Sequence, residues 1–188
     1  MPLTAHLSQA AWLALGRWML LAGAATRARL CFLCTCRKVD AAPEAWAALA
    51  HARAGRGHVQ AALRWQQRAV ALAPDRAAYH YNLGYLAERL HALAQAEASF
   101  RRALALSPRM DLAWFGLGRV LRQQGRWVEA QQSFEENARL QPLSPHGWEA
   151  IARLQVTQGQ REAGLATVAH LRTFEPRVAE RLSQELFA

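Results

Sequence analysis

Cysteine is nearly absent from this sequence of 188 residues, which holds three, Cys31, Cys34 and Cys36, all close to the N-terminus. A metal site built from thiolates normally needs four ligands, and no second Cys or His pair follows at ligand spacing. Three interpretations of the cluster stay open: a metal or redox role, acylation beside a membrane, or cysteines that are only apolar. We favour the last, and expect the rest of the chain to fold without disulfides or metal.

Enzyme signatures are also missing. The seven histidines are scattered, and the sequence has no HExxH spacing, phosphate-binding glycine loop, nucleophile elbow or paired carboxylate motif. We therefore expect a protein that is not an enzyme and needs no cofactor.

Lysine occurs once, whereas arginine is abundant, and the formal net charge is +9. Arginine suits bidentate contacts with carboxylates and phosphates, although a GC-rich genome produces the same bias. No run of Lys and Arg and no nucleic-acid motif accompanies the charge. An acidic protein partner is thus favoured over nucleic acid.

A long apolar run is lacking too, because residues 10–25 are apolar but contain Arg17. A membrane-spanning helix needs about 20 apolar residues, and a cleavable signal peptide would need basic residues before this stretch. Five interpretations remain: a spanning helix, an interfacial helix with Trp12 and Trp18 at the lipid boundary, an exported leader, a helix packed on the first repeat, or a poorly ordered leader. Basic residues after the stretch would keep the remainder on the cytoplasmic side. We therefore expect a cytoplasmic protein or one at the cytoplasmic face of a membrane.

What the sequence does contain is a strict repeat. Its period is marked by Pro74, Pro108, Pro142 and Pro176, which follow one another at a constant interval, and Trp46, His80, Trp114 and Trp148 recur at the same interval. Glycine keeps this period at Gly57, Gly125 and Gly159, with His91 in the remaining place. A fixed period of this length indicates stacked supersecondary units.

Each repeat has the pattern of two helices. In the third, Asp111 is expected to cap a first helix, Gly125 to end it, and Pro142 to end the second. Small residues at Gly118 and Ala130 should let the two helices approach closely. One such pair cannot bury its apolar faces alone, so the repeats must stack.

The pattern resembles the tetratricopeptide repeat, whose signature places Trp, Leu-Gly, Tyr, Gly, Ala, Phe, Ala and Pro along a unit of about 34 residues. The third repeat carries Trp114, Leu117-Gly118, Gly125, Ala130, Phe134 and Pro142, and the second carries Tyr81-Asn82-Leu83-Gly84, Ala96, Phe100, Ala103 and Pro108. Asn137 and Leu171 stand where the family has alanine.

The resemblance implies an all-α fold, a right-handed α-solenoid of four helix-turn-helix units with a C-terminal capping helix. The expected repeats are 43–76, 77–110, 111–144 and 145–178, after an N-terminal segment 1–42 and before a capping helix 177–188. Val178, Leu182 and Leu186 would form the apolar face of that helix.

In this family the first helices line a concave groove. The groove residues with binding chemistry would be Tyr81, Asn82, Tyr85, Phe115, Arg119, Arg122 and Arg153, and His146 and Glu149 also fall at groove positions. Aromatic anchors beside guanidinium groups suit an acidic peptide or a C-terminal carboxylate. The carboxylate clamp of some chaperone adaptors is absent, because Leu112 and Gly116 replace its basic pair.

These features predict a non-catalytic adaptor or scaffold that binds a peptide segment of a protein partner. One version is tethered to a membrane, where it assembles a complex. The alternatives are a soluble co-chaperone or regulatory adaptor, and a repeat subunit that acts with a separate enzyme.

Overall fold

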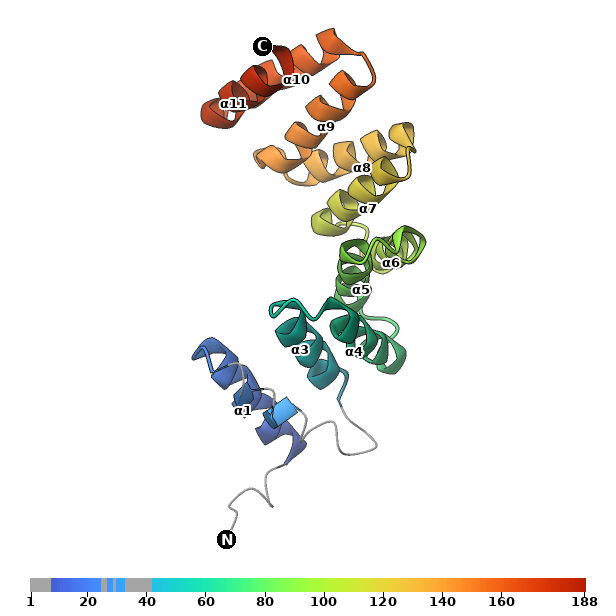
Figure 1. Cartoon of the computed structure of the whole chain (residues 1–188), viewed down its shortest axis with the longest axis vertical. Helices are drawn as coiled ribbons and strands as arrows, with labels where there is room; N and C mark the ends of the chain where they lie inside the picture. The colour runs from blue at the N-terminus through green and yellow to red at the C-terminus, as the bar shows by residue number, and fades with distance from the viewer. Residues whose placement is uncertain (1–7, 25–26, 29, 33–41) are drawn as a thin grey trace. The chain divides into compact units, whose positions relative to one another are not determined.

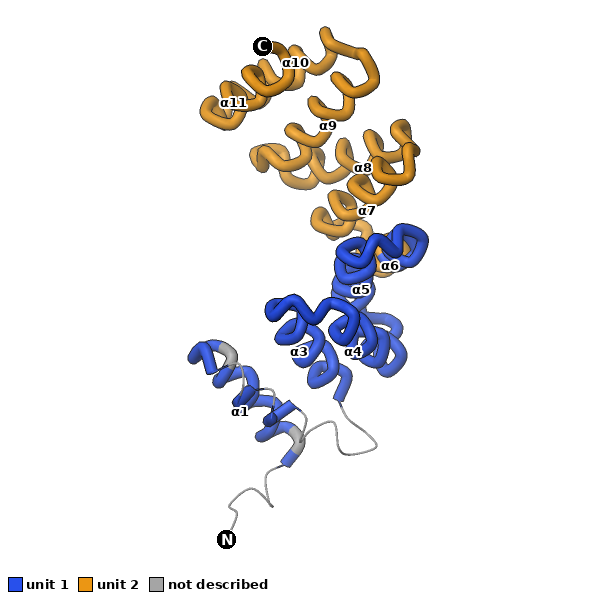
Figure 2. The backbone as a smooth tube through the Cα atoms, in the orientation of Figure 1, with its two compact units in different colours: residues 1–99 blue, residues 100–188 orange. Residues whose placement is uncertain are grey.

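A computed structural model describes residues 8–24, 27–28, 30–32 and 42–188, and in this part of the chain all regular secondary structure is helical (Figure 1). The helices that follow the N-terminal segment are α3 (Pro43–Ala54), α4 (Val59–Leu72), α5 (Ala77–Arg89), α6 (Leu93–Leu106), α7 (Asp111–Gln123), α8 (Trp127–Leu140), α9 (Pro145–Thr157), α10 (Arg161–Arg172) and α11 (Pro176–Phe187). The chain divides into two compact units, residues 1–99 and 100–188, and the division falls within α6 (Figure 2). The predicted all-α class is confirmed.

Helices that are consecutive in the sequence pack against one another within each unit. In the N-terminal unit α3 contacts α4 and α4 contacts α5, and in the C-terminal unit the contacts run in order from α7 to α11. The first helices of the four predicted repeats are α3, α5, α7 and α9, and the second helices are α4, α6, α8 and α10. Within each unit, helices that follow one another in sequence thus bury apolar residues against each other, as in a solenoid.

The turn between the two helices of each repeat needs a left-handed backbone. Gly57, Gly125 and Gly159 have φ of 81°, 76° and 76°, and His91 has φ of 56°. Glycine adopts this conformation without steric cost, whereas a side chain at Cβ is strained there. His91 thus adopts the glycine conformation of the other three turns, although its side chain is strained there.

The repeated proline and the repeated tryptophan are joined by a hydrogen bond. Trp114 Nε1 donates to the Pro108 carbonyl, and Trp148 Nε1 donates to the Pro142 carbonyl, each over 2.9 Å. His80 Nε2 lies 2.9 Å from the Pro74 carbonyl, an acceptor only, so this nitrogen carries the proton. His80, which is buried, replaces both the bulk and the donor of the tryptophan.

Two details of the helix ends differ from the prediction. Asp111 does not cap α7, because Met110 is the N-cap residue. Asp111 lies in the first turn, where its negative charge interacts favourably with the positive end of the helix dipole. Pro176 does not follow α10 as the other prolines follow their helices. It is the first residue of α11, and α10 ends earlier, at Arg172. Proline fits both places because it lacks an N–H and fixes φ.

Close packing of α7 on α8 depends on the small residue Gly118, as the sequence predicted, and this glycine lies opposite a phenylalanine. A Cβ atom at Gly118 would lie 2.6 Å from the ring of Phe134, far inside van der Waals contact. Phe134 is almost completely buried. The absent side chain therefore makes the space that this ring fills.

Asn137 shows how the repeat tolerates a departure from alanine. Its side chain is buried, and Nδ2 donates to the Asp111 carbonyl over 2.9 Å. Its Oδ1 occupies the space next to Gly147, where an added Cβ would lie only 2.6 Å away. The larger residue is thus accommodated by a glycine on the next helix.

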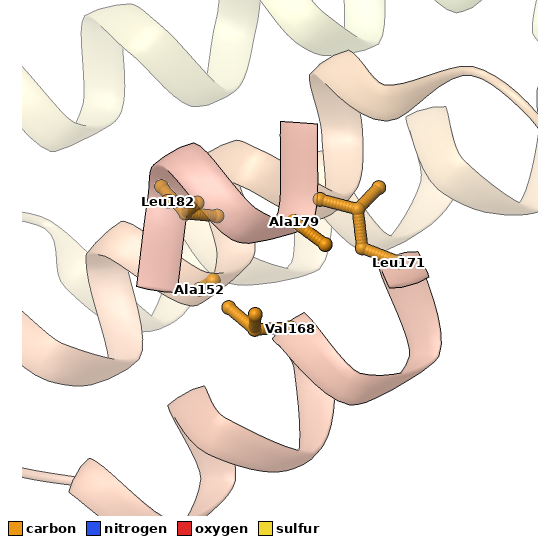
Figure 3. Packing of buried hydrophobic residues seen from close by; sticks show 5 residues of the cluster. All are labelled: Ala152, Val168, Leu171, Ala179 and Leu182. Carbon is orange, nitrogen blue, oxygen red and sulfur yellow. The ribbon is translucent and has the colours of Figure 1, made fainter. Parts of the chain in front are cut away.

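The last helix closes the core of the C-terminal unit. Ala179 and Leu182 of α11 form a cluster with Ala152, Val168 and Leu171, and all five are almost fully buried (Figure 3). Val178 and Leu186 pack against the same cluster, so the predicted apolar face of this helix is confirmed. Helix α11 thus covers the apolar residues Val168 and Leu171 of α10.

Helix α1 and the described residues that follow it pack on the first repeat in the N-terminal unit. Leu13 and Met19 of α1 (Gln9–Leu21) contact a cluster of Ala28, Phe32 and Leu49. This arrangement is the packed helix among the interpretations left open by the sequence. Among the described residues, no helix combines the length and the apolar character needed to cross a membrane.

Candidate peptide-binding site

The C-terminal unit carries a cavity of about 200 Å³ on α7 and α9, with one wall from α8. It is lined by Phe115, Arg119, Arg122, Phe134, His146, Glu149, Ala150 and Arg153. The lining combines aromatic rings with three guanidinium groups, which is the chemistry expected for the groove. The sequence spacing explains why Phe115, Arg119 and Arg122 line the same cavity. They are three or four residues apart and therefore share one face of α7.

Aromatic rings form the apolar part of this cavity. The Phe115 ring lies 5.7 Å from that of Phe134 and 6.2 Å from that of His146, centroid to centroid, and both pairs are tilted. Such distances are typical of favourable aromatic contacts. The Phe134 ring, which is buried and lies close against Gly118, forms the floor of the cavity.

The arginines differ in how they are held. The Arg119 guanidinium carbon lies 6.0 Å from the centroid of the Phe115 ring, at the outer limit of a cation–π contact. Arg122 is exposed. Arg153 donates to Glu185 of α11 over 2.5 Å, and beside it Arg181 of α11 donates to Glu149 over 3.0 Å. The last helix therefore supplies a carboxylate to one arginine of the cavity.

The pKa of Glu185 is lowered, chiefly by the hydrogen bond from Arg153 and further by the charges of Arg153 and Arg181. A carboxylate with a lowered pKa stabilises the fold above the pKa of the unfolded chain, and this contribution is lost as pH falls through the folded-state pKa. At neutral pH the contact between α11 and Arg153 is therefore an ion pair.

The structure thus brings Phe115, Arg119, Arg122 and Arg153 together around one cavity. Sequence reasoning missed Phe134 as a wall and Glu185 as a partner of Arg153. Phe134 stands at a core position of the repeat, which gave no reason to place it at a binding surface. The i, i+4 pair of Arg181 and Glu185 in the capping helix was the available signal for a charged contact.

The other predicted residues lie on α5 in the N-terminal unit. Asn82 and Tyr85 line a small cavity of about 50 Å³, together with His51 and Gln66, whereas Tyr81 is half-buried outside that lining. Gln66 stands at the place held by Phe100 and Phe134 in later repeats, and its Nε2 donates to the Tyr79 carbonyl over 2.9 Å. The alanines Ala47, Ala50 and Ala54 of α3 complete the hollow.

A larger cavity, of about 490 Å³, opens in the C-terminal unit beside Trp114 and was not predicted. Its acidic wall includes Glu129 and Glu136, one helical heptad apart on α8. Both carboxylates are paired: Arg126 and Arg101 donate to Glu129, and Arg139 donates to Glu136. The hydrogen bond from Arg126 is the main reason that the pKa of Glu129 is lowered. We assign this cavity no ligand.

The cysteine cluster is only partly described. Cys31 is buried and its Sγ lies 3.8 Å from the Met19 sulfur, whereas Cys34 and Cys36 lie outside the described residues. Within the described ranges, no group of three or more His, Cys, Asp or Glu is placed to hold a metal.

Several solved structures have the same fold. A crystal structure of MamA is 19% identical, with a TM-score of 0.82, and the match covers 88% of this chain and 96% of that one. YrrB, described as a TPR protein with an unusual peptide-binding site, is 16% identical with a TM-score of 0.82, covering 94% and 92%. TTC0263 from Thermus thermophilus is 22% identical with a TM-score of 0.69, covering 96% and 100%. At these identities the likeness establishes the fold alone.

The sequence itself supplies the family. A comparison with curated proteins found no match. The family model for the tetratricopeptide repeat matches residues 47–111 and again residues 81–145, which together span more than half of the chain. Members of this family generally serve as non-catalytic scaffolds for protein interactions. With this match, the successive helix pairs and the shared fold, the chain belongs to the tetratricopeptide repeat family.

Proposed function

We propose that this protein is an adaptor that holds an acidic peptide segment of a partner in the cavity between α7 and α9. The observation that carries the proposal is that Arg119, Arg122 and Arg153 surround a cavity whose floor is aromatic. We further propose that it lacks catalytic activity and acts in the cytoplasm or at the cytoplasmic face of a membrane. Tyr81, Asn82 and Tyr85 remain proposed binding residues of the N-terminal unit.

The chemistry of the cavity selects for both charge and an apolar anchor. A guanidinium group can donate two parallel hydrogen bonds to a carboxylate, and such charge-assisted bonds are about twice as strong as neutral ones. The half-buried ring of Phe115 offers contact area to an apolar side chain, and it packs against the buried ring of Phe134. A peptide with an apolar residue between acidic residues satisfies both parts of the lining.

Reversing two charges should weaken this binding. The Arg119→Glu/Arg122→Glu variant is expected to bind acidic peptides about 10- to 100-fold more weakly, because attractive contacts become repulsive. The measurement is fluorescence anisotropy with a panel of labelled peptides that place leucine between glutamates and end in a free carboxylate.

The matched control is Arg102→Glu/Arg109→Glu, which changes the net charge equally at exposed arginines outside the cavity. It should retain binding to within about threefold, since distant charges act mainly through screened long-range attraction. If no peptide of the panel binds, or if both variants weaken binding equally, the proposed site is wrong.

The internal carboxylate of α11 should compete with the ligand. The Glu185→Gln variant is expected to bind the acidic peptides about two- to fivefold more tightly, because Arg153 is no longer paired with a charge. The same anisotropy titration measures this change. Glu180→Gln is the control, since it removes the same charge from α11 at a residue that pairs with Arg172 instead. Equal effects of the two substitutions would argue against a role of Arg153 in binding.

A further inference from the structure

Helix α1 has a second apolar face, which is exposed in the part of the chain that the structure describes. The face that carries Gly16 and Met19 packs on Phe32 and the first repeat. Elsewhere on the helix Ala14, Trp18 and Leu21 follow at spacings of four and three residues, and all three are exposed. We call these three residues the apolar stripe. Residues at such spacings share one face of a helix, so the stripe is continuous along α1.

Large apolar side chains are open to water in this segment. The exposed fractions of Trp18 and Leu21 are 64% and 88%, and Leu30, in the short described segment after the helix, is 60% exposed. Leu30 directly precedes Cys31, whose sulfur contacts Met19 of α1. A helix that buries one face and leaves tryptophan and leucine exposed on another is unusual for a surface that faces only water.

The charged residues of the sequence before Asp40 are all basic. Arg17 is next to Trp18 and is exposed, as is Arg27, beyond the end of the helix. The sequence adds Arg29, Arg37 and Lys38, and no Asp or Glu occurs before Asp40. A partner surface that complements the apolar stripe is therefore one with an apolar interior and anionic groups at its edge.

We propose that the apolar stripe of α1, together with Leu30, attaches the protein to the surface of an anionic lipid bilayer. The helix lies in the plane of the interface, with Trp18 and Leu21 among the acyl chains nearest the headgroups. The phosphate groups of the lipids meet Arg17 and Arg27. This attachment is independent of the peptide cavity, which belongs to the other unit.

The chemistry of these side chains fits this depth. Tryptophan has an apolar ring and a polar N–H, a combination that favours the boundary between acyl chains and water. Interfacial helices combine such apolar residues with cationic ones, and their binding depends on the buried apolar area plus attraction to anionic lipids. Because attraction near a charged leaflet decays within a Debye length, added salt should weaken the binding.

Vesicle flotation with the full chain tests the proposal. Vesicles of phosphatidylcholine and phosphatidylglycerol in equal parts should carry the protein, and vesicles of phosphatidylcholine alone should carry much less. The Trp18→Ser/Leu21→Ser/Leu30→Ser variant is expected to lose at least about tenfold in partitioning onto the anionic vesicles, because the apolar anchor is removed.

The control variant replaces the same residue types, one tryptophan and two leucines, at exposed places of the C-terminal unit: Trp127→Ser/Leu112→Ser/Leu143→Ser. It should float like the unchanged protein. Circular dichroism checks that each variant is folded, and Trp18→Ser alone replaces the α1 variant if the latter unfolds.

Three results would overturn the proposal. The first is that the unchanged protein does not bind anionic vesicles, and the second is that the α1 variant binds them as well as the control variant. The third is a dimer in sedimentation that the α1 substitutions dissociate and the control substitutions do not, because a second copy of the chain would then cover this face.

Discussion

The Phe134→Ala variant should unfold with a free energy about 3–5 kcal/mol lower than that of the unchanged protein. The phenyl ring is 1% exposed, and it fills the space left by Gly118 on α7. Alanine would leave a cavity at the contact of α7 with α8, since neighbouring helices in a repeat array cannot collapse freely into it. The ring is also the floor of the proposed binding cavity, so acidic peptides should bind more weakly in conditions where the variant is still folded.

Urea unfolding followed by circular dichroism measures the change in stability. Phe134→Leu is the comparison, because it keeps most of the apolar volume and should cost well under half as much. A loss below about 1 kcal/mol for alanine would mean that the ring is not a packed element of the core. If the leucine variant binds peptides normally while alanine does not, the floor acts through its volume rather than through its aromatic ring.

The Leu182→Ala variant should lose about 2–5 kcal/mol of stability. Leu182 of α11 is completely buried among Val168, Leu171 and Ala152. Truncation removes apolar contact at the outer side of the fourth repeat, where α11 is the described helix that covers α10. Because Glu185 lies on the same helix, loosening α11 should also weaken its ion pair with Arg153.

Thermal and urea unfolding provide the measurement, with Leu143→Ala as the control. Leu143 is 73% exposed in the turn after α8, so its truncation should change stability by less than about 0.5 kcal/mol. Similar losses for the two variants would contradict the role of α11 as a cap. Selective loss for Leu182 would show that the last helix contributes to the cooperative core.

The helical architecture follows from local pattern. In the first three repeats the period sets where helices begin and end, because glycine at a left-handed turn and proline after a helix act within a few residues. The backbone conformation of His91 is predictable in the same way, since the period alone assigns it the conformation of Gly57 and Gly125. The gathering of Phe115, Arg119 and Arg122 is predictable for the same reason, because residues three and four apart share one helix face.

Contacts between helices that are far apart in sequence are less accessible to such reasoning. The ion pair of Arg153 with Glu185 joins residues 32 positions apart and depends on how α11 packs on α9. The coupling of Asn137 to Gly147 likewise appears only when α8 and α9 are in contact. Neither leaves a signal in the local pattern of apolar residues. The face of α1 that packs on Phe32 is similarly set by the tertiary contact, since α1 is apolar on both faces.

The hydrogen bond between a proline carbonyl and the tryptophan or histidine six residues later has a consequence for how such a chain can change in length. The donor and the acceptor of each of these bonds belong to adjacent repeats. Each bond therefore depends on the short stretch of sequence that joins the proline of one repeat to the tryptophan or histidine of the next, which we call the junction. Duplication or deletion of one whole period preserves that spacing at every junction that remains, whereas an insertion of any other length near a junction separates the two groups. The bond therefore makes the array tolerant of gene rearrangements in steps of one whole period and intolerant of smaller ones at its junctions.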